Sequence, residues 1–279
     1  MLQETQFASL VGVDLGRFWG KGSFEFDWVG APGRSGGLVS LWDPKRFSAS
    51  RVVKSRFFLC IHGYLKDDGK AFSLINIYAP QKLRDKRSLC AELEGIIVRD
   101  NAFWVVGGYF NCVRDRSERR NSRFNALVSN EFNDFIDKVE LHEFTLKGRK
   151  FTFVSGNKCS RIDRILVSWN FVNEWTNAEY RALAREESDH CPLVLKIEAQ
   201  YFGPKHFRFF NSWLSRDRLS EVVDKVEIEE ELNLKAELCE LDELIDERDS
   251  TETEMRVLNE AKNRLREMGD IKKKDIRQK

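Results

Sequence analysis

Polar residues that could carry out chemistry gather at four places along the chain, each beside a short apolar run. They are Gln3-Glu4-Thr5, Gly107-Gly108-Tyr109-Phe110-Asn111, Ser160-Arg161-Ile162-Asp163-Arg164 and Ser188-Asp189-His190-Cys191-Pro192. A carboxylate is an oxygen ligand for a hard cation, and an imidazole can transfer a proton near neutral pH. Each motif taken alone is more typical of a turn or a surface. Together they require a scaffold that presents several strand ends at one place.

The elements that must position these motifs read as strands interspersed with helices. Short apolar or β-branched runs predict strands at 36–42, 56–64, 72–80, 103–108, 151–155, 161–168 and 192–197. Apolar residues at helical spacing predict helices over 84–99 and 122–139. Several of the runs are apolar on both faces. We therefore expect a mixed α/β fold whose sheet is covered on both sides.

The composition changes after Trp213, which is the last aromatic residue of the chain. The segment that follows is rich in charged and helix-forming residues and has no proline. We therefore divide the chain into a body over 1–200, a connector over 201–220 and a charged tail over 221–279.

The tail carries two helical patterns. Their apolar positions are Leu234, Leu238, Leu241 and Ile245 in the first, and Leu258, Ala261, Leu265 and Met268 in the second. Between them, Thr251 and Glu254 have the spacing of a capping box, which predicts an antiparallel helical hairpin. Each apolar stripe is narrow, so the hairpin packs on itself, on the body or on a partner. The alternative is a solvated spacer.

Length and composition limit the class of protein. The chain has 279 residues, of which 42% are hydrophobic and 12% aromatic, so it can bury a sizeable core. No apolar run approaches the ~18 residues of a membrane span, and the first residues lack the pattern of a secretory signal. Six scattered cysteines without a C-x-x-C pair argue against a zinc site or a disulfide framework. We expect a soluble, intracellular protein with no membrane partner.

Charge is unevenly distributed between the body and the tail. Residues 221–279 contain 19 acidic and 12 basic residues of the 45 and 46 in the chain, so residues 1–220 contain 26 and 34, a net charge of +8. A basic body suits a polyanionic partner, because Lys and Arg contacts to phosphates give affinity without sequence preference. An excess of this size is equally compatible with ordinary surface charge.

In this order and at these separations, the motifs resemble the endonuclease/exonuclease/phosphatase family, which has the DNase I-like fold. The matching segments are LQET, NIYAP, GGYFN, SRIDRILVS and SDHCPL. The segments SRIDRILVS, SDHCPLVL and FRFFNSWL (207–214) are especially similar to the reverse-transcriptase polyproteins of plant non-LTR (LINE-type) retrotransposons. This resemblance implies a four-layer α/β sandwich of two mixed sheets flanked by helices. It also implies DNA as the partner, Mg²⁺ or Mn²⁺ as the cofactor and a nuclear location.

The resemblance assigns the metal and the proton transfer to four residues. Glu4 would bind the metal, and Asp189 would supply a second carboxylate, directly or through water. His190 would contact the scissile phosphate or transfer a proton. Asp163 would fix the tautomer and the orientation of His190, as carboxylates do for imidazoles elsewhere.

Four further residues would contact the substrate. Asn111 would position the phosphate or the attacking water, and the Tyr78 hydroxyl would donate to a phosphate oxygen. Arg161 and Arg164 flank the aspartate of the R-I-D motif and would contact the nucleic-acid backbone, although both also fit ordinary surface positions.

The chain departs from the family pattern at Tyr109. The family motif G-G-D-F-N reads G-G-Y-F-N here, so a tyrosine stands where the family has its proposed catalytic aspartate. A phenol with a pKa near ~10 is not an anion at neutral pH. Loss of a positioned acid or base usually lowers a rate by about 10²–10⁴. The ring should also crowd the phosphate pocket.

A second departure lies at the amino terminus. The family opens with a strand that ends in an asparagine, some tens of residues before the metal-binding glutamate. Met1 lies three residues before Glu4, so we expect this first strand to be missing and a sheet position to be unpaired. Because site residues act as a unit, losing two of them predicts an impaired or inactive enzyme.

Three functions remain open. The first is a retrotransposon-derived, divalent-metal-dependent DNA endonuclease that is impaired or inactive in this copy. The second is a non-catalytic relic that binds nucleic acid. The third is a phosphatase of the same family, which the retrotransposon-like segments argue against. The first two differ in whether Tyr109 permits catalysis.

Overall fold

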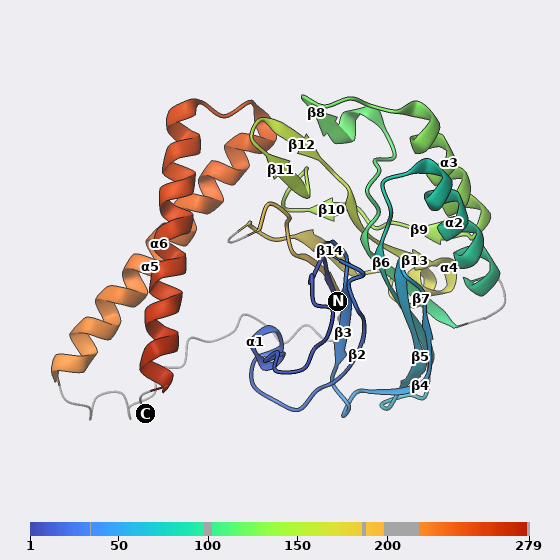
Figure 1. Cartoon of the computed structure of the whole chain (residues 1–279), viewed down its shortest axis with the longest axis horizontal. Helices are drawn as coiled ribbons and strands as arrows, with labels where there is room; N and C mark the ends of the chain where they lie inside the picture. The colour runs from blue at the N-terminus through green and yellow to red at the C-terminus, as the bar shows by residue number, and fades with distance from the viewer. Residues whose placement is uncertain (34, 98–101, 186–187, 198–217, 278–279) are drawn as a thin grey trace.

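A computed structural model of the chain describes residues 1–33, 35–97, 102–185, 188–197 and 218–277 (Figure 1). Within the last of these segments, the side chains of residues 231–269 are described. The segment FRFFNSWL and most of the predicted connector lie outside the described residues.

A six-stranded sheet forms the centre of the body, with the spatial order β4-β5-β6-β7-β13-β9. Its strands are β4 (Phe47–Lys54), β5 (Phe58–Leu65), β6 (Ala71–Tyr78), β7 (Phe103–Tyr109), β13 (Asp163–Ser168) and β9 (Leu141–His142). Strands β6 and β7 are parallel, and every other neighbouring pair is antiparallel. The parallel pair is joined by helix α2 (Leu83–Ile97), as a parallel connection requires a crossover.

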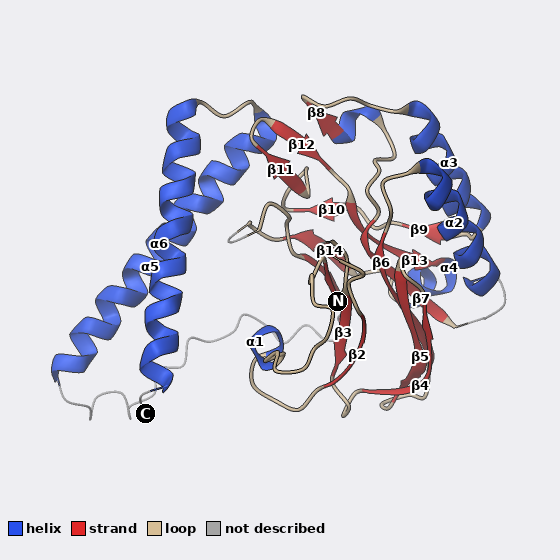
Figure 2. Ribbon diagram, in the orientation of Figure 1, coloured by secondary structure: helices blue, strands red, loops and turns tan. Residues whose placement is uncertain are grey.

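Both faces of this sheet are buried, as predicted. On β5, Phe58 and Cys60 face one side while Leu59 and Ile61 face the other. The first side packs against α2 and against α3 (Ala126–Lys138). The second side packs against the strands of the other layer, so the body has helices on one face of the sheet and strands on the other (Figure 2). The predicted mixed α/β class is confirmed.

Two three-stranded sheets form the second layer. One has the order β1-β3-β2, from β1 (Leu2–Gln3), β3 (Leu38–Trp42) and β2 (Glu25–Val29). The other has the order β10-β14-β15, from β10 (Leu146–Lys147), β14 (Glu179–Ala182) and β15 (Leu193–Lys196). Among the described residues, β1 and β15 each have a strand neighbour on one side only.

The remaining elements of the body are short. A third small sheet has the order β11-β12-β8, from β11 (Phe153–Ser155), β12 (Lys158–Ser160) and β8 (Arg119–Arg120). Helices α1 (Gly16–Trp19) and α4 (Trp169–Glu174) and the 3₁₀ helix η1 (Arg116–Glu118) complete it. Strands β2, β4 and β14 were not predicted, because charged and small polar residues interrupt their apolar runs.

The tail forms the expected helical hairpin, α5 (Arg218–Glu247) and α6 (Glu252–Arg277), which lie side by side (Figure 1). The capping box is present: the Thr251 N–H donates to the Glu254 carboxylate at 2.8 Å, and the Glu254 N–H donates to the Thr251 hydroxyl at 3.3 Å. Apolar side chains of both helices pack against Phe151 of the body, so the alternative of a solvated spacer is wrong. None of the described helices is long and apolar enough to cross a membrane.

Candidate active site

Three predicted site residues lie in a row at one end of the central sheet. Tyr78 pairs with Tyr109 across β6 and β7, and Tyr109 pairs with Asp163 across β7 and β13. Tyr78 and Tyr109 end their strands, whereas Asp163 begins the antiparallel β13. Because directly paired residues project from the same face of a sheet, the three side chains share one surface.

His190 and Asp163 form a hydrogen-bonded pair. His190 Nδ1 lies 2.8 Å from Asp163 Oδ2, and the imidazole packs against the ring of Phe153 with centroids 4.8 Å apart. Burial lowers the pKa of His190, but the hydrogen bond to Asp163 and the charges of Asp163, Asp189 and Glu4 outweigh it and raise the pKa overall. The hydrogen bond orients the imidazole, and the raised pKa favours its protonated form.

Thr152 holds both members of this pair in place. Its buried hydroxyl accepts the backbone N–H groups of Ile162 and Asp163, each at 3.0 Å. Its carbonyl accepts the N–H of Cys191, directly after the histidine, at 2.7 Å. Sequence reasoning missed this residue. The available signal is a hydroxyl residue between two phenylalanines at the start of an apolar run.

The opposite side of the site is built by the amino terminus. The Tyr78 hydroxyl donates to the Glu4 carboxylate. Asn76 is 0% exposed; its Nδ2 donates to the Leu2 carbonyl at 3.1 Å, and its Oδ1 accepts from Gln3 Nε2 at 2.5 Å. Asn76 therefore ties β1, and with it Glu4, to the central sheet. It was also missed, although it belongs to the NIYAP segment.

A cavity of about 500 Å³ lies between these two groups of residues. The amino-terminal residues, β7, the start of β13 and segment 188–193 line it. It brings together Glu4, Tyr109, Asp163, Asp189 and His190. Residues of β1 and of β15 both line this cavity.

Asn111 is not among the residues that line the cavity, and neither are Tyr78 and Arg161. Its backbone carbonyl accepts from Lys86 Nζ at 2.8 Å, and its φ of 54° lies in the left-handed region. The structure therefore brings Glu4 and Asp189 to the same cavity as the Asp163–His190 pair, whereas Asn111 does not line it.

The ring of Tyr109 fills the space between the two sides of the site. It stacks on Tyr78 with centroids 5.3 Å apart and planes at 22°, and it meets His190 at the same distance and at 75°. Burial raises the pKa of Tyr109, and the charges of Glu4 and Asp163 raise it further. The phenol is therefore neutral at physiological pH, and its ring occupies room that a small carboxylate would leave free.

The donor set fits a hydrated divalent cation. Among the described residues, no group of three or more His, Cys, Asp and Glu side chains is arranged to hold a metal ion. Mg²⁺ is usually bound through one or two carboxylates and keeps several waters. Glu4 and Asp189 both line the cavity and supply this number of carboxylates.

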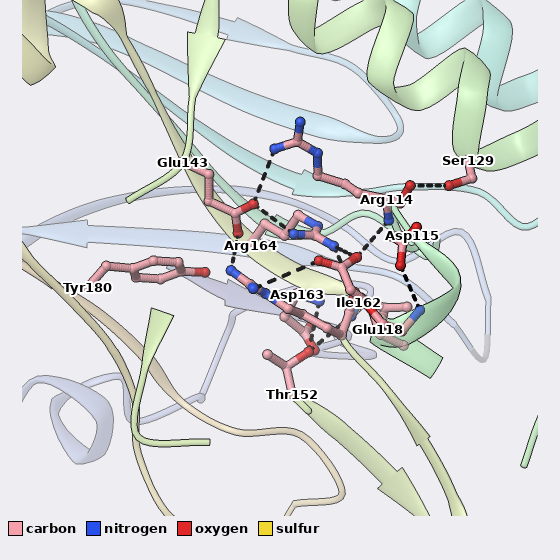
Figure 3. Close-up of polar contacts among 12 residues, drawn as sticks. Arg114, Asp115, Glu118, Ser129, Glu143, Thr152, Ile162, Asp163, Arg164 and Tyr180 are labelled. Carbon is pink, nitrogen blue, oxygen red and sulfur yellow. Dashed lines mark hydrogen bonds and ion pairs between the residues drawn. The ribbon is translucent and has the colours of Figure 1, made fainter. Parts of the chain in front are cut away.

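The two predicted arginines have structural roles. The guanidinium of Arg164 is 0% exposed and is bound by Glu118 and by Glu143, the latter at 2.7 Å (Figure 3). Arg161 pairs with Glu143 at 2.6 Å. A fully buried guanidinium with two carboxylate partners does not reach a nucleic acid, so the predicted backbone contact of Arg164 is wrong. These ion pairs instead support the strand that begins with Asp163.

Comparison with known proteins agrees with this geometry. Residues 1–190 match the Endonuclease/Exonuclease/phosphatase family. No curated protein matches the chain. Similar solved structures include the AP endonuclease LMAP from Leishmania major, with 14% identity and a TM-score of 0.54 over 70% of this chain and 76% of that one. This likeness supports the fold.

Two further solved structures are similar at lower TM-scores. The endonuclease domain of TRAS1, a telomere-specific non-LTR retrotransposon, has 13% identity and a TM-score of 0.49, over 64% of this chain and 81% of that one. Truncated TDP2 from Caenorhabditis elegans has 15% identity and a TM-score of 0.45, over 69% and 80%. The family match spans well over half of the sequence and includes the Asp163–His190 pair, and the chain belongs to the endonuclease/exonuclease/phosphatase family.

Proposed function

We propose that the chain is a retrotransposon-derived, divalent-metal-dependent phosphodiesterase domain acting on DNA, and that Tyr109 impairs it. The observation that carries the proposal is the pairing of His190 with Asp163 at 2.8 Å across one cavity from Glu4. An oriented imidazole facing a carboxylate across a cavity suits metal-assisted attack on a phosphodiester.

Each residue has a defined task in this proposal. Asp163 accepts from Nδ1 of His190, which leaves Nε2 to donate to a phosphate oxygen or to the leaving alkoxide. Glu4 and Asp189 would hold Mg²⁺ or Mn²⁺, which supplies positive charge to the phosphate oxygens when bound. The Tyr78 hydroxyl holds Glu4, and Asn111 is proposed to position the phosphate or the attacking water.

DNA is the proposed substrate class on two grounds. The net charge of +8 over residues 1–220 suits a long polyanion. The segments SRIDRILVS and SDHCPLVL resemble plant retrotransposon sequences rather than phosphatases of small molecules. A genomic target would require a nuclear location.

A second candidate function is a non-catalytic nucleic-acid-binding relic. The position of the Tyr109 ring favours it, because the ring lies against both Tyr78 and His190 and its phenol stays neutral. In this case the fold and the basic charge persist while cleavage is lost.

Nicking of supercoiled plasmid with Mg²⁺ or Mn²⁺ tests the proposal. We expect weak or no nicking by the native chain and a gain of about 10²–10⁴ in Tyr109→Asp, which restores a positioned carboxylate. Tyr109→Phe is the matched control, since it removes the hydroxyl and keeps the ring. Adding His190→Ala to Tyr109→Asp should abolish the gained activity.

The opposite outcomes are equally informative. Nicking by the native chain that His190→Ala abolishes would show that the site works with Tyr109 in place. If Tyr109→Asp is folded but does not nick, while the native chain still retards DNA in a gel, the relic function is the correct one.

A further inference from the structure

One buried ion pair connects the C-terminal hairpin to the segment before the active-site histidine. Asp242 of α5 and Arg185 are 1% and 2% exposed. Asp242 Oδ1 accepts from Arg185 Nη2 at 2.7 Å and from Nε at 3.1 Å, and Oδ2 accepts from the Arg185 backbone N–H at 3.0 Å. Both oxygens of the carboxylate therefore accept from Arg185, and Oδ2 also lies 3.9 Å from Nε of the buried Arg149.

The same guanidinium also contacts two residues that lie next to the site in the sequence. Arg185 Nη1 donates to the Phe151 carbonyl at 3.2 Å and lies 3.3 Å from Cys191 Sγ. Cys191 directly follows the active-site histidine, and Phe151 directly precedes Thr152, which holds the Asp163 N–H. The Arg185 side chain therefore contacts Phe151, which precedes Thr152, and Cys191, which follows His190.

The hairpin is seated firmly enough to orient Asp242. Leu238 and Ile245 of α5 and Leu258 and Ala261 of α6 are buried together with Phe151. Arg120 of β8 also donates to the Arg248 carbonyl at 2.9 Å, at the end of α5. Apolar contacts and a hydrogen bond from the Arg120 side chain to the main chain therefore set the position of α5, and the carboxylate of Asp242 has a defined place.

We infer that Asp242 is a positioning residue of the active site, which acts through Arg185 on the Asp163–His190 pair. A buried ion pair contributes little net stability, because desolvation offsets the attraction, whereas its charge-assisted hydrogen bonds impose a defined geometry. The helical hairpin is thereby part of the catalytic unit. The expected effect on DNA cleavage rests on the proposed function, but the expected effect on the His190 hydrogen bond does not.

The test uses the full chain and three variants. Asp242→Asn removes the charge of the carboxylate, and Asp242→Asn with Arg185→Gln removes both charges of the pair, so that Arg185 is not left buried without its partner. Arg149, which also pairs with Asp242, keeps its ion pair with Glu243 at 3.6 Å. Leu258→Ala is the control, because it weakens the same hairpin contact without touching Asp242. Thermal unfolding shows how far each change destabilises the chain.

The first readout is the Nδ1–H proton of His190 in metal-free, ¹⁵N-histidine-labelled protein. The chain has four histidines, so His190→Gln assigns the signal. We expect the hydrogen-bonded signal to shift or broaden beyond detection in both Asp242 variants. The signal should stay at its native position in Leu258→Ala, even if that variant unfolds at the same temperature as the Asp242 variants or at a lower one.

The second readout is the nicking rate in the Tyr109→Asp background. We expect the nicking rate of both Asp242 variants to fall about 10²-fold, because small displacements of reacting groups cause losses of this size. The rate of Leu258→Ala should be unchanged. A native His190 signal in the double variant would overturn the inference and reduce the pair to a docking contact. Unfolding of both Asp242 variants would overturn it as well, because the pair would then hold the fold. If Tyr109→Asp does not nick, the proposed function fails and the His190 signal still decides the role of Asp242.

Discussion

The ring of Tyr109 meets the imidazole of His190 edge to face, with centroids 5.3 Å apart and planes at 75°. The imidazole is also held by Asp163 at 2.8 Å, so it contacts an acid on one side and a phenol on the other. The phenol stays neutral because burial raises its pKa. The GGYFN segment therefore places a neutral ring between Tyr78 and His190 at the centre of the site.

The response to metal should depend on residue 109. We expect Mn²⁺ or Mg²⁺ to raise the melting temperature of Tyr109→Asp more than that of Tyr109→Phe, because only the first adds a third carboxylate beside Glu4 and Asp189. A ligand at 100 times its Kd stabilises a fold by about 2.7 kcal/mol. Differential scanning fluorimetry with and without EDTA measures this. An equal metal response in both variants would contradict the assignment.

Removal of the Thr152 hydroxyl should destabilise the body. Thr152→Val keeps the shape of the side chain but leaves the buried N–H groups of Ile162 and Asp163 without an acceptor. Each unsatisfied donor costs about 1–3 kcal/mol, so urea denaturation should show a clear loss. Thr152→Ser retains the hydroxyl and should lose much less. Equal losses in the two variants would contradict this, because the methyl group would then contribute as much as the hydroxyl.

Asn76 should control how Glu4 is held. Asn76→Leu removes the side-chain bonds to Gln3 and to the Leu2 carbonyl, so β1 loses its attachment to β6. We expect a loss of about 1–3 kcal/mol in the free energy of unfolding. In the Tyr109→Asp background, the response to metal should also disappear. A preserved metal response would show that β3 alone positions Glu4.

The hairpin should lose stability in acid through Glu254. The hydrogen bond from Arg248 and the backbone N–H of Thr251 lower the pKa of Glu254 to about 2. A depressed folded-state pKa adds stability that is complete above the unfolded value of about 4.5 and is lost as pH falls through the folded value. The native chain should therefore have a higher melting temperature than Glu254→Gln at pH 7, and the two melting temperatures should converge near pH 2.

The control for this experiment is Glu260→Gln, on the same helix but outside the capping box. Its melting curve should follow that of the native chain across the same pH range. Added salt should narrow the difference between the native chain and Glu254→Gln, because the pair is exposed and screened. A difference that persists at pH 2 would point to side-chain shape rather than charge.

Much of this protein was determined by local sequence pattern. Apolar runs of strand length predicted β3, β5, β6, β7 and β13, and helical spacing predicted α2, α3 and both tail helices. The motifs that contain Asp163 and His190 marked the site, because strand ends and the residues beside them recur at short, readable spacings. The capping box at Thr251 was predicted for the same reason, because both of its residues lie within one helical turn.

Other features were decided only by the tertiary structure. Arg164 reads as a surface residue but is enclosed by Glu118 and Glu143, which the chain brings from other segments. The contact of Arg185 with Asp242 joins residues 57 positions apart, and that of Gln3 with Asn76 spans 73. No periodicity encodes such pairings, because they depend on how separate elements pack and on which polar groups that packing buries. Patterns along the chain reveal which residues can react, and packing alone decides which of them are held together.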